Sequence, residues 1–182
     1  PTLATNIKKD WKAVQIKTAG ILNPISVRNL SGERGSLIGR GLLLSLNANI
    51  TSSSSIKFQG IYGNGIASYL NLAENSAYDV VLNPNDGEYQ LTNCYGGYIA
   101  FNQVIIKKYI DIDIVYGLVN LKMEDYFPDY LFKAGQYITV NAFVQNPEAF
   151  RLGMEYSYGY KKTKDDSHGN ANRFAFTFYY DF

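Results

Sequence analysis

The residues best suited to chemistry in this sequence are charged side chains at every second position of apolar segments. They are Lys17, Lys57, Asp111, Asp113, Arg151, Glu155, Arg173 and Asp181. Alternate residues of a strand share one face, so this spacing predicts a charged face on a sheet. Four cations against four anions give no net bias. If this face lines a water-filled path, an electric field across the path would act on passing ions. All of these charged residues except Asp181 are candidate lining residues of the path. The alternative is ordinary wall polarity, in which Arg151 and Glu155 satisfy each other.

The only histidine, His168, follows Asp165 and Asp166 in a polar segment. A hydrolase would need a serine and this histidine held together on a rigid wall, whereas the segment is predicted to be a solvated loop. A weak cation site made by the three side chains is an alternative to the solvated loop. The lysines of 161–164 could instead meet lipopolysaccharide phosphates. We expect no enzyme, no cofactor and no resident metal.

The elements that position these residues show period-two alternation, which is typical of strands. The pattern is clearest at the end, where Phe174, Phe176, Phe178, Tyr180 and Phe182 alternate with smaller or polar residues. Eight strands are predicted, near 11–22, 40–50, 55–63, 94–102, 109–121, 136–146, 149–160 and 172–182. All five prolines lie outside these segments, as sheet hydrogen bonding favours.

The predicted connections alternate in length. Short ones fall near 51–55, 103–108 and 146–148, and long ones at 23–38, 64–93, 122–135 and 161–171. Outer-membrane barrels show this asymmetry, with short periplasmic turns and long external loops. The sequence therefore predicts an all-β, antiparallel transmembrane barrel in the bacterial outer membrane, with its C-terminus on the periplasmic side.

Composition supports this fold class. Charged residues make up 18% of the chain and aromatic residues 15%, with 16 Tyr; soluble domains average about 25% charged residues. No apolar run approaches the ~18 residues of a membrane helix. The net charge of +1 gives no reason to expect a nucleic-acid partner. In a soluble eight-stranded barrel the large apolar side chains would point inward and overfill the interior.

The terminal segment 173–182 resembles the C-terminal strand by which outer-membrane proteins are recognised for assembly. Five further segments resemble the DcaP-like trimeric porins: Gly39-Arg-Gly41, Tyr62-Gly-Asn-Gly-Ile66, Tyr95-Gly-Gly-Tyr-Ile-Ala-Phe101, Val115-Tyr-Gly117 and Arg151-Leu-Gly-Met-Glu-Tyr-Ser-Tyr-Gly159. The resemblance implies a homotrimer of sixteen-stranded barrels that pass small, mainly anionic solutes such as dicarboxylates. It also implies that this chain is the C-terminal half of the barrel, and that the inward constriction loop belongs to the other half or is the 64–93 connection.

Two functions remain open on the sequence. The first is a diffusion porin for small polar solutes, embedded in outer-membrane lipid and lipopolysaccharide. The second is a complete eight-stranded barrel without a channel, with a structural or adhesive role. Small residues on the predicted inner face favour an open lumen, because a plugged one needs bulky side chains. They are Gly117, Gly153, Ser157, Gly159 and Ala175.

Overall fold

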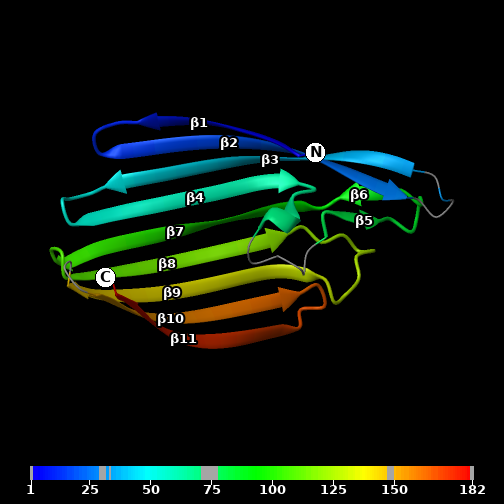
Figure 1. The fold of residues 1–182 in the computed structure, drawn as a ribbon. Coiled ribbons are helices and arrows are strands. Elements are labelled where there is room, and N and C mark those ends of the chain that lie inside the picture. Colours follow the sequence, from blue (N-terminus) through cyan, green and yellow to red (C-terminus); the bar gives the residue numbers. More distant parts are fainter. Residues whose placement is uncertain (1, 29–31, 33, 71–77, 147–149, 181–182) are drawn as a thin grey trace.

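The computed structural model describes residues 2–28, 32, 34–70, 78–146 and 150–180, and most of them lie in strands. Nine strands form one antiparallel sheet in the order β1-β2-β3-β4-β7-β8-β9-β10-β11 (Figure 1). Their bounds are β1 Leu3–Asp10, β2 Val14–Arg28, β3 Arg34–Asn49, β4 Ser54–Asn64, β7 Asn93–Ile106, β8 Ile110–Leu121, β9 Phe132–Asn146, β10 Phe150–Thr163 and β11 His168–Tyr180. The predicted all-β, antiparallel fold is confirmed.

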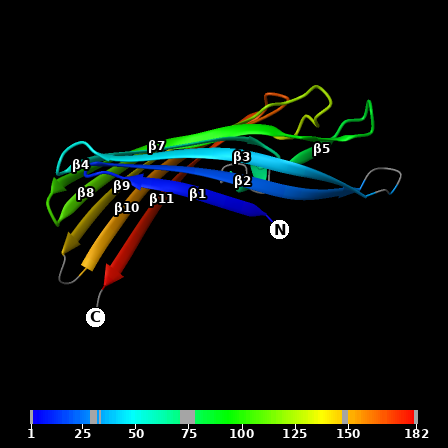
Figure 2. The same ribbon diagram turned by 90° about the horizontal axis from the view of Figure 1, so that it is seen from above.

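The sheet is curved, with β1 and β11 bent toward the same side of β7 (Figure 2). Every strand pairs with its neighbour in the order, but β1 and β11 are the two ends of that order and the sheet is not closed. Directly opposite residues of paired strands point to the same face, so the register divides the side chains into a concave and a convex set. Within the described residues, no helix is long and apolar enough to cross a bilayer.

The convex face carries the large apolar side chains expected from the alternation. Phe174, Phe176 and Phe178 of β11 are 62–78% exposed. Leu42, Tyr62 and other large apolar residues continue this surface across the sheet. In water such a surface would be costly, whereas lipid tails cover it without penalty.

The connections at one end of the sheet are short, at residues 11–13, 50–53 and 107–109. The opposite end carries the longest connection, 65–92, which contains the 3₁₀ turn η1 (Ala67–Tyr69) and a small hairpin of β5 (Val80–Leu82) and β6 (Tyr89–Leu91). Figure 1 shows η1 in front of the main sheet, over its concave side. The predicted asymmetry of the two ends is therefore present for these connections.

Three predictions about strand extent were wrong. β1 was missed because its alternation is weak: Leu3 and Ile7 share a face with Thr5 and Lys9, and the whole strand is exposed. The segment 23–38 is mostly strand, because β2 and β3 pair as far as Arg28 and Arg34. The last connection covers only 164–167, since small polar residues of β11 still pair with β10.

Pro24 also lies inside a strand, against the prediction. It is opposite Ile38 of β3, beyond Leu22, where the pairing of β2 with β1 ends. A proline lacks the N–H that a second neighbour would need. Pro24 therefore occupies the part of β2 with a partner on one side only, which is the edge position that proline tolerates.

Candidate functional site

The register places all seven candidate lining residues on the concave face. Lys57 and Arg173 lie in one cross-strand row that runs through Ala100, Val115, Thr139 and Ser157. Asp113 and Glu155 share the next row, through Asn141. Asp181 lies outside the described residues. The shared face follows from pairing alone; that it lines a water-filled path stays a prediction.

Charge is unevenly spread across this face. Lys17 and Lys57 belong to β2 and β4, whereas Asp111 and Asp113 belong to β8. The missed strand β1 adds Lys8, directly opposite Lys17, together with Asp10. Lys8 Nζ is 3.3 Å from the Asp10 carboxylate, which relieves repulsion between the two lysines. The additions leave the charge count balanced, with the lysines on β1, β2 and β4 and the two aspartates on β8, where Asp113 accepts from Asn102 Nδ2 at 2.9 Å.

The predicted Arg151–Glu155 pair is not formed. Glu155 instead accepts from the guanidinium of Arg173 at 2.5 Å and from Ser157 Oγ at 3.1 Å. The guanidinium carbon of Arg151 lies 4.0 Å from the ring centroid of Phe143, a cation–π arrangement. The Nε atom of Arg151 is buried and has no hydrogen-bond partner in the described part of the chain.

The segment 65–70 folds back onto the concave face, and glycines form its seat. A Cβ atom on Gly41 would lie 2.3 Å from Ile66 Cδ1, and one on Gly63 would lie 2.6 Å from the same atom. A Cβ on Gly39 would lie 2.3 Å from the carbonyl oxygen of Gly65. No real side chain tolerates such distances, so we name Gly39, Gly41 and Gly63 the glycine seat. Ile66 is fully buried on it.

Hydrogen bonds fix the same segment at two points. Asn23 of β2 is buried and donates from Nδ2 to the carbonyl of Gly65 at 3.0 Å. The carboxylate of Asp79 accepts from Ser68 N at 2.9 Å and from Ser68 Oγ at 2.6 Å. Ile66, Leu70 and Cys94 share one apolar cluster with residues of β8 and β9. Cys94 is a free cysteine buried within this cluster.

A pocket of about 220 Å³ lies between the docked segment and the sheet wall. Tyr69 and Leu70 line it from the segment, and Gln59, Tyr98 and Tyr137 line it from the strands. The pocket combines aromatic rings with groups able to form hydrogen bonds. The docked segment 65–70 occupies part of the space over the concave face. The alternation of apolar residues could not predict this pocket, because the position of the pocket depends on how 65–70 folds.

Rings of neighbouring strands cover two of the small inner residues. Tyr137 is opposite Gly117, where an added Cβ would meet the tyrosine ring at 2.1 Å. Phe143 likewise lies over Gly153, with an added Cβ 2.9 Å from its ring. Gly159 has nothing within 4 Å of the equivalent position. These covered glycines are packing sites for aromatic rings, so they do not by themselves indicate an open lumen.

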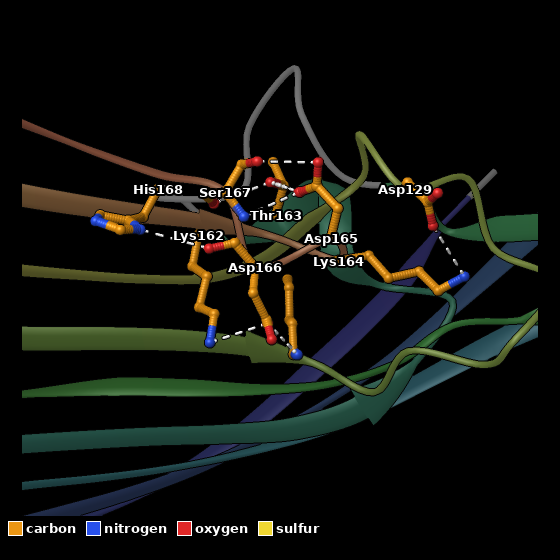
Figure 3. A network of polar contacts seen from close by, with 9 residues as sticks. Asp129, Lys162, Thr163, Lys164, Asp165, Asp166, Ser167 and His168 are labelled. Carbon is orange, nitrogen blue, oxygen red and sulfur yellow. Dashed lines mark hydrogen bonds and ion pairs between the residues drawn. The ribbon is translucent and has the colours of Figure 1, made fainter.

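His168 lies beside a turn of lysine, aspartate, serine and threonine side chains (Figure 3). Within the described residues its ring nitrogen contacts only the backbone oxygen of Asp166, at 3.4 Å, and the ring lies 5.8 Å from that of Tyr160. The Asp166 carboxylate is bound by Lys133 and Lys162, at 2.9 and 3.0 Å. No metal-binding cluster of His, Cys, Asp or Glu occurs in the described ranges.

Asp165 and Lys164, next to Asp166, also form hydrogen bonds with other residues of the protein. Asp165 accepts from Thr163 Oγ1 and from the Ser167 N–H and hydroxyl. Lys164 Nζ donates to the backbone oxygen of Asp125 at 2.6 Å (Figure 3 shows its approach to Asp129, at 3.5 Å). Asp165 therefore closes the turn on itself, and Lys164 ties the turn to the β8–β9 connection.

No protein-family model and no curated protein matches the sequence. Solved structures of outer-membrane proteins are similar to it. The outer membrane channel DcaP of Acinetobacter baumannii aligns with a TM-score of 0.85 and 16% identity, over 100% of this chain and 51% of that chain. Outer-membrane expressed OmpT of Vibrio cholerae aligns with a TM-score of 0.63 and 11% identity, over 98% of this chain and 56% of that chain. The chain therefore has the fold of outer-membrane β-barrel proteins and spans about half the length of these two.

Proposed function

We propose that the protein is an outer-membrane diffusion channel for small polar solutes. The observation that carries the proposal is the division of the sheet between an apolar convex face and a charged concave face onto which 65–70 folds. A lipid-facing exterior, a polar interior and a segment that narrows the interior are the parts of a selective barrel channel. No chemistry on a solute is required, and the surroundings of His168 favour a non-enzymatic role.

The strand count supports a larger barrel than the described sheet. Nine antiparallel strands place β1 and β11 in the same direction, so direct closure would make them parallel neighbours. Bacterial single-chain outer-membrane barrels have an even number of strands paired antiparallel. We infer that further strands complete the barrel, and the resemblance to trimeric porins suggests sixteen in each member of a homotrimer.

The docked segment 65–70 is our candidate for the constriction. Its pocket places Tyr69, Tyr98 and Tyr137 beside the charged rows, where a solute would exchange water for hydroxyl groups. The preference for anions such as dicarboxylates rests on the family resemblance, because the concave charges are balanced. Lys8, Lys17 and Lys57 form the side of the face along which an anion would travel.

The asymmetry between the two ends of the sheet supports one orientation in the membrane. We propose that the end with the 65–92 connection faces outward, into the lipopolysaccharide layer, and that the short turns and the C-terminus face the periplasm. The exposed rings of β11 would then meet membrane lipid.

The test is reconstitution of the full-length protein that contains this chain into planar bilayers. A channel gives stepwise conductance, and a tenfold KCl gradient gives a reversal potential whose sign reports anion preference. Replacing chloride by succinate should preserve a measurable current. A folded, inserted protein without conductance would refute the channel and favour the non-conducting barrel.

A further inference from the structure

The convex face contains a hollow among its large side chains. Gly60 of β4 and Gly97 of β7 are directly opposite each other, so neither adds a side chain to the floor, and the ring of Phe58 borders it, 3.3 Å from the position of a Cβ atom on Gly60. The hollow has a volume of about 630 Å³. Its rim is apolar, half aliphatic and half aromatic: Leu42, Leu44, Phe58, Tyr62, Tyr95, Ile99, Tyr116 and Leu118. We name it the convex groove.

A row of polar residues crosses the sheet at the end of this groove that lies nearest to the 65–92 connection. Arg40 is opposite Asn64, Asn64 is opposite Asn93, and Lys122 follows in line because its N–H donates to the carbonyl of Asn93. Arg40, Asn64 and Asn93 line a second hollow of about 390 Å³ that continues the groove past Leu42 and Tyr62. This polar row, with its charged and amide side chains, therefore borders one end of the apolar convex groove, and we call it the polar rim.

The rim offers unused binding capacity. Arg40 is exposed and forms no ion pair with any described residue. Lys122 Nζ pairs with Glu124 at 2.9 Å, yet its side chain remains 67% exposed and able to meet a second anion.

The distance between the two positively charged side chains, Arg40 and Lys122, indicates which ligand fits the groove. Arg40 and Lys122 are separated by three strand intervals, or about 14 Å at ~4.8 Å each. One phosphate cannot bridge that span, whereas lipid A carries a phosphate at each end of its sugar pair and acyl chains that point away from both. Four residues of strand separate the rim from the glycine floor, about 13 Å at ~3.3 Å per residue, which is room for the first part of an acyl chain.

We propose that the convex groove and its rim form a binding site for the lipid A part of lipopolysaccharide, with one phosphate on Arg40, the other toward Lys122 and an acyl chain over Gly60 and Gly97. The site requires the outward orientation proposed above but does not require that the barrel conducts. A conductance failure would therefore leave it standing, and a binding failure would leave the channel standing.

The experiment uses the full-length protein, refolded without lipopolysaccharide in detergent, and native mass spectrometry with bisphosphorylated lipid A as the probe. Arg40→Gln should weaken binding roughly tenfold, the usual loss for one charge-assisted contact. Gly60→Leu should weaken it to a similar extent without changing any charge. Arg34→Gln is the matched control, because it removes the same charge six residues farther along β3, and it should bind as the unaltered protein does.

Three outcomes would overturn the proposal. The first is unchanged binding in both Arg40→Gln and Gly60→Leu. The second is equal affinity for phosphatidylglycerol, which has one phosphate. The third is a change of oligomer mass in Gly60→Leu with lipid binding intact, which would make a second copy of the chain the occupant. If either variant does not fold, as judged by its migration on an unheated gel, Lys122→Gln tests the other end of the rim.

Discussion

Substitution of Gly41 by alanine would test whether the glycine seat holds 65–70 against the concave face. The added Cβ would lie 2.3 Å from Ile66 Cδ1 and 3.1 Å from Ile21 Cγ2, whereas carbon atoms pack best at ~3.5–4.0 Å. Overpacking of this kind costs ~1–3 kcal/mol. The strand itself loses no hydrogen bond, so the cost should fall on the docked segment.

A double-mutant cycle isolates the effect. Ile66→Val removes only Cδ1 and should cost ~0.5–1.5 kcal/mol alone. In the Gly41→Ala background it also removes the clash, since the nearest remaining contact is Ile21 at 3.1 Å. The double variant should therefore be more stable than the sum of the single effects predicts, by ~1 kcal/mol or more.

The assay is urea unfolding of the full-length protein in detergent, with hydrogen exchange of the 65–70 amides as the local readout. Gly41→Ala should accelerate exchange at Leu70, whose N–H donates to Ala67, and should raise single-channel conductance. Gly159→Ala is the control, because its added Cβ meets nothing within 4 Å on the same face. Additivity within ~0.5 kcal/mol would refute the seat.

Three further predictions concern the wall and the outer turn. Glu155→Gln removes the partner of Arg173 and one negative charge, so the reversal potential in a KCl gradient should shift toward anions; no shift would argue that this face does not line the path. Tyr137→Ala uncovers Gly117 and should lower urea stability by ~1 kcal/mol while increasing solute flux, whereas unchanged flux would place the ring outside the path. Hydrogen bonds from Lys133 and Lys162 lower the pKa of Asp166 from 3.8 to about 2, so its stabilisation of the turn is complete above pH 3.8 and lost as pH falls through about 2. The protection factors of amides 163–168, which correct the exchange rates for their intrinsic pH dependence, should fall over that window in the unaltered protein and stay constant in Asp166→Asn; the same fall in both would exclude Asp166 as the cause.

The alternation of large apolar residues was sufficient to predict the strands of the sheet and the face that the seven described charged residues share. It failed where alternation is weak, as in β1, whose exposed Leu3 and Ile7 are separated by polar residues. It also failed where a strand continues past the apolar band in small polar residues, as at the start of β11. Polar strand ends carry a loop-like composition but still complete hydrogen bonds with a neighbour.

For the candidate site, the sequence predicts the face on which a residue lies within its own strand, but it does not predict the partner of that residue on a neighbouring strand. Arg151 and Glu155 are four residues apart, which is about 13 Å in a strand, so they cannot pair. The partner of Glu155 is set by the register of β10 with β11, where Arg173 lies diagonally across from it. The docking of Ile66 was likewise beyond the pattern, because it joins a connection to glycines of two other strands.

The glycine seat has an evolutionary consequence. Positions 39, 41 and 63 have no room for a side chain beneath the docked segment 65–70. Substitutions at these positions should therefore occur together with changes in that segment. A sequence that gains a methyl group at position 41 should also carry a smaller residue than isoleucine at position 66, as compensation. In a deep collection of homologous sequences, positions 41 and 66 should therefore covary in volume, while position 159 on the same face should accept side chains without any matching change.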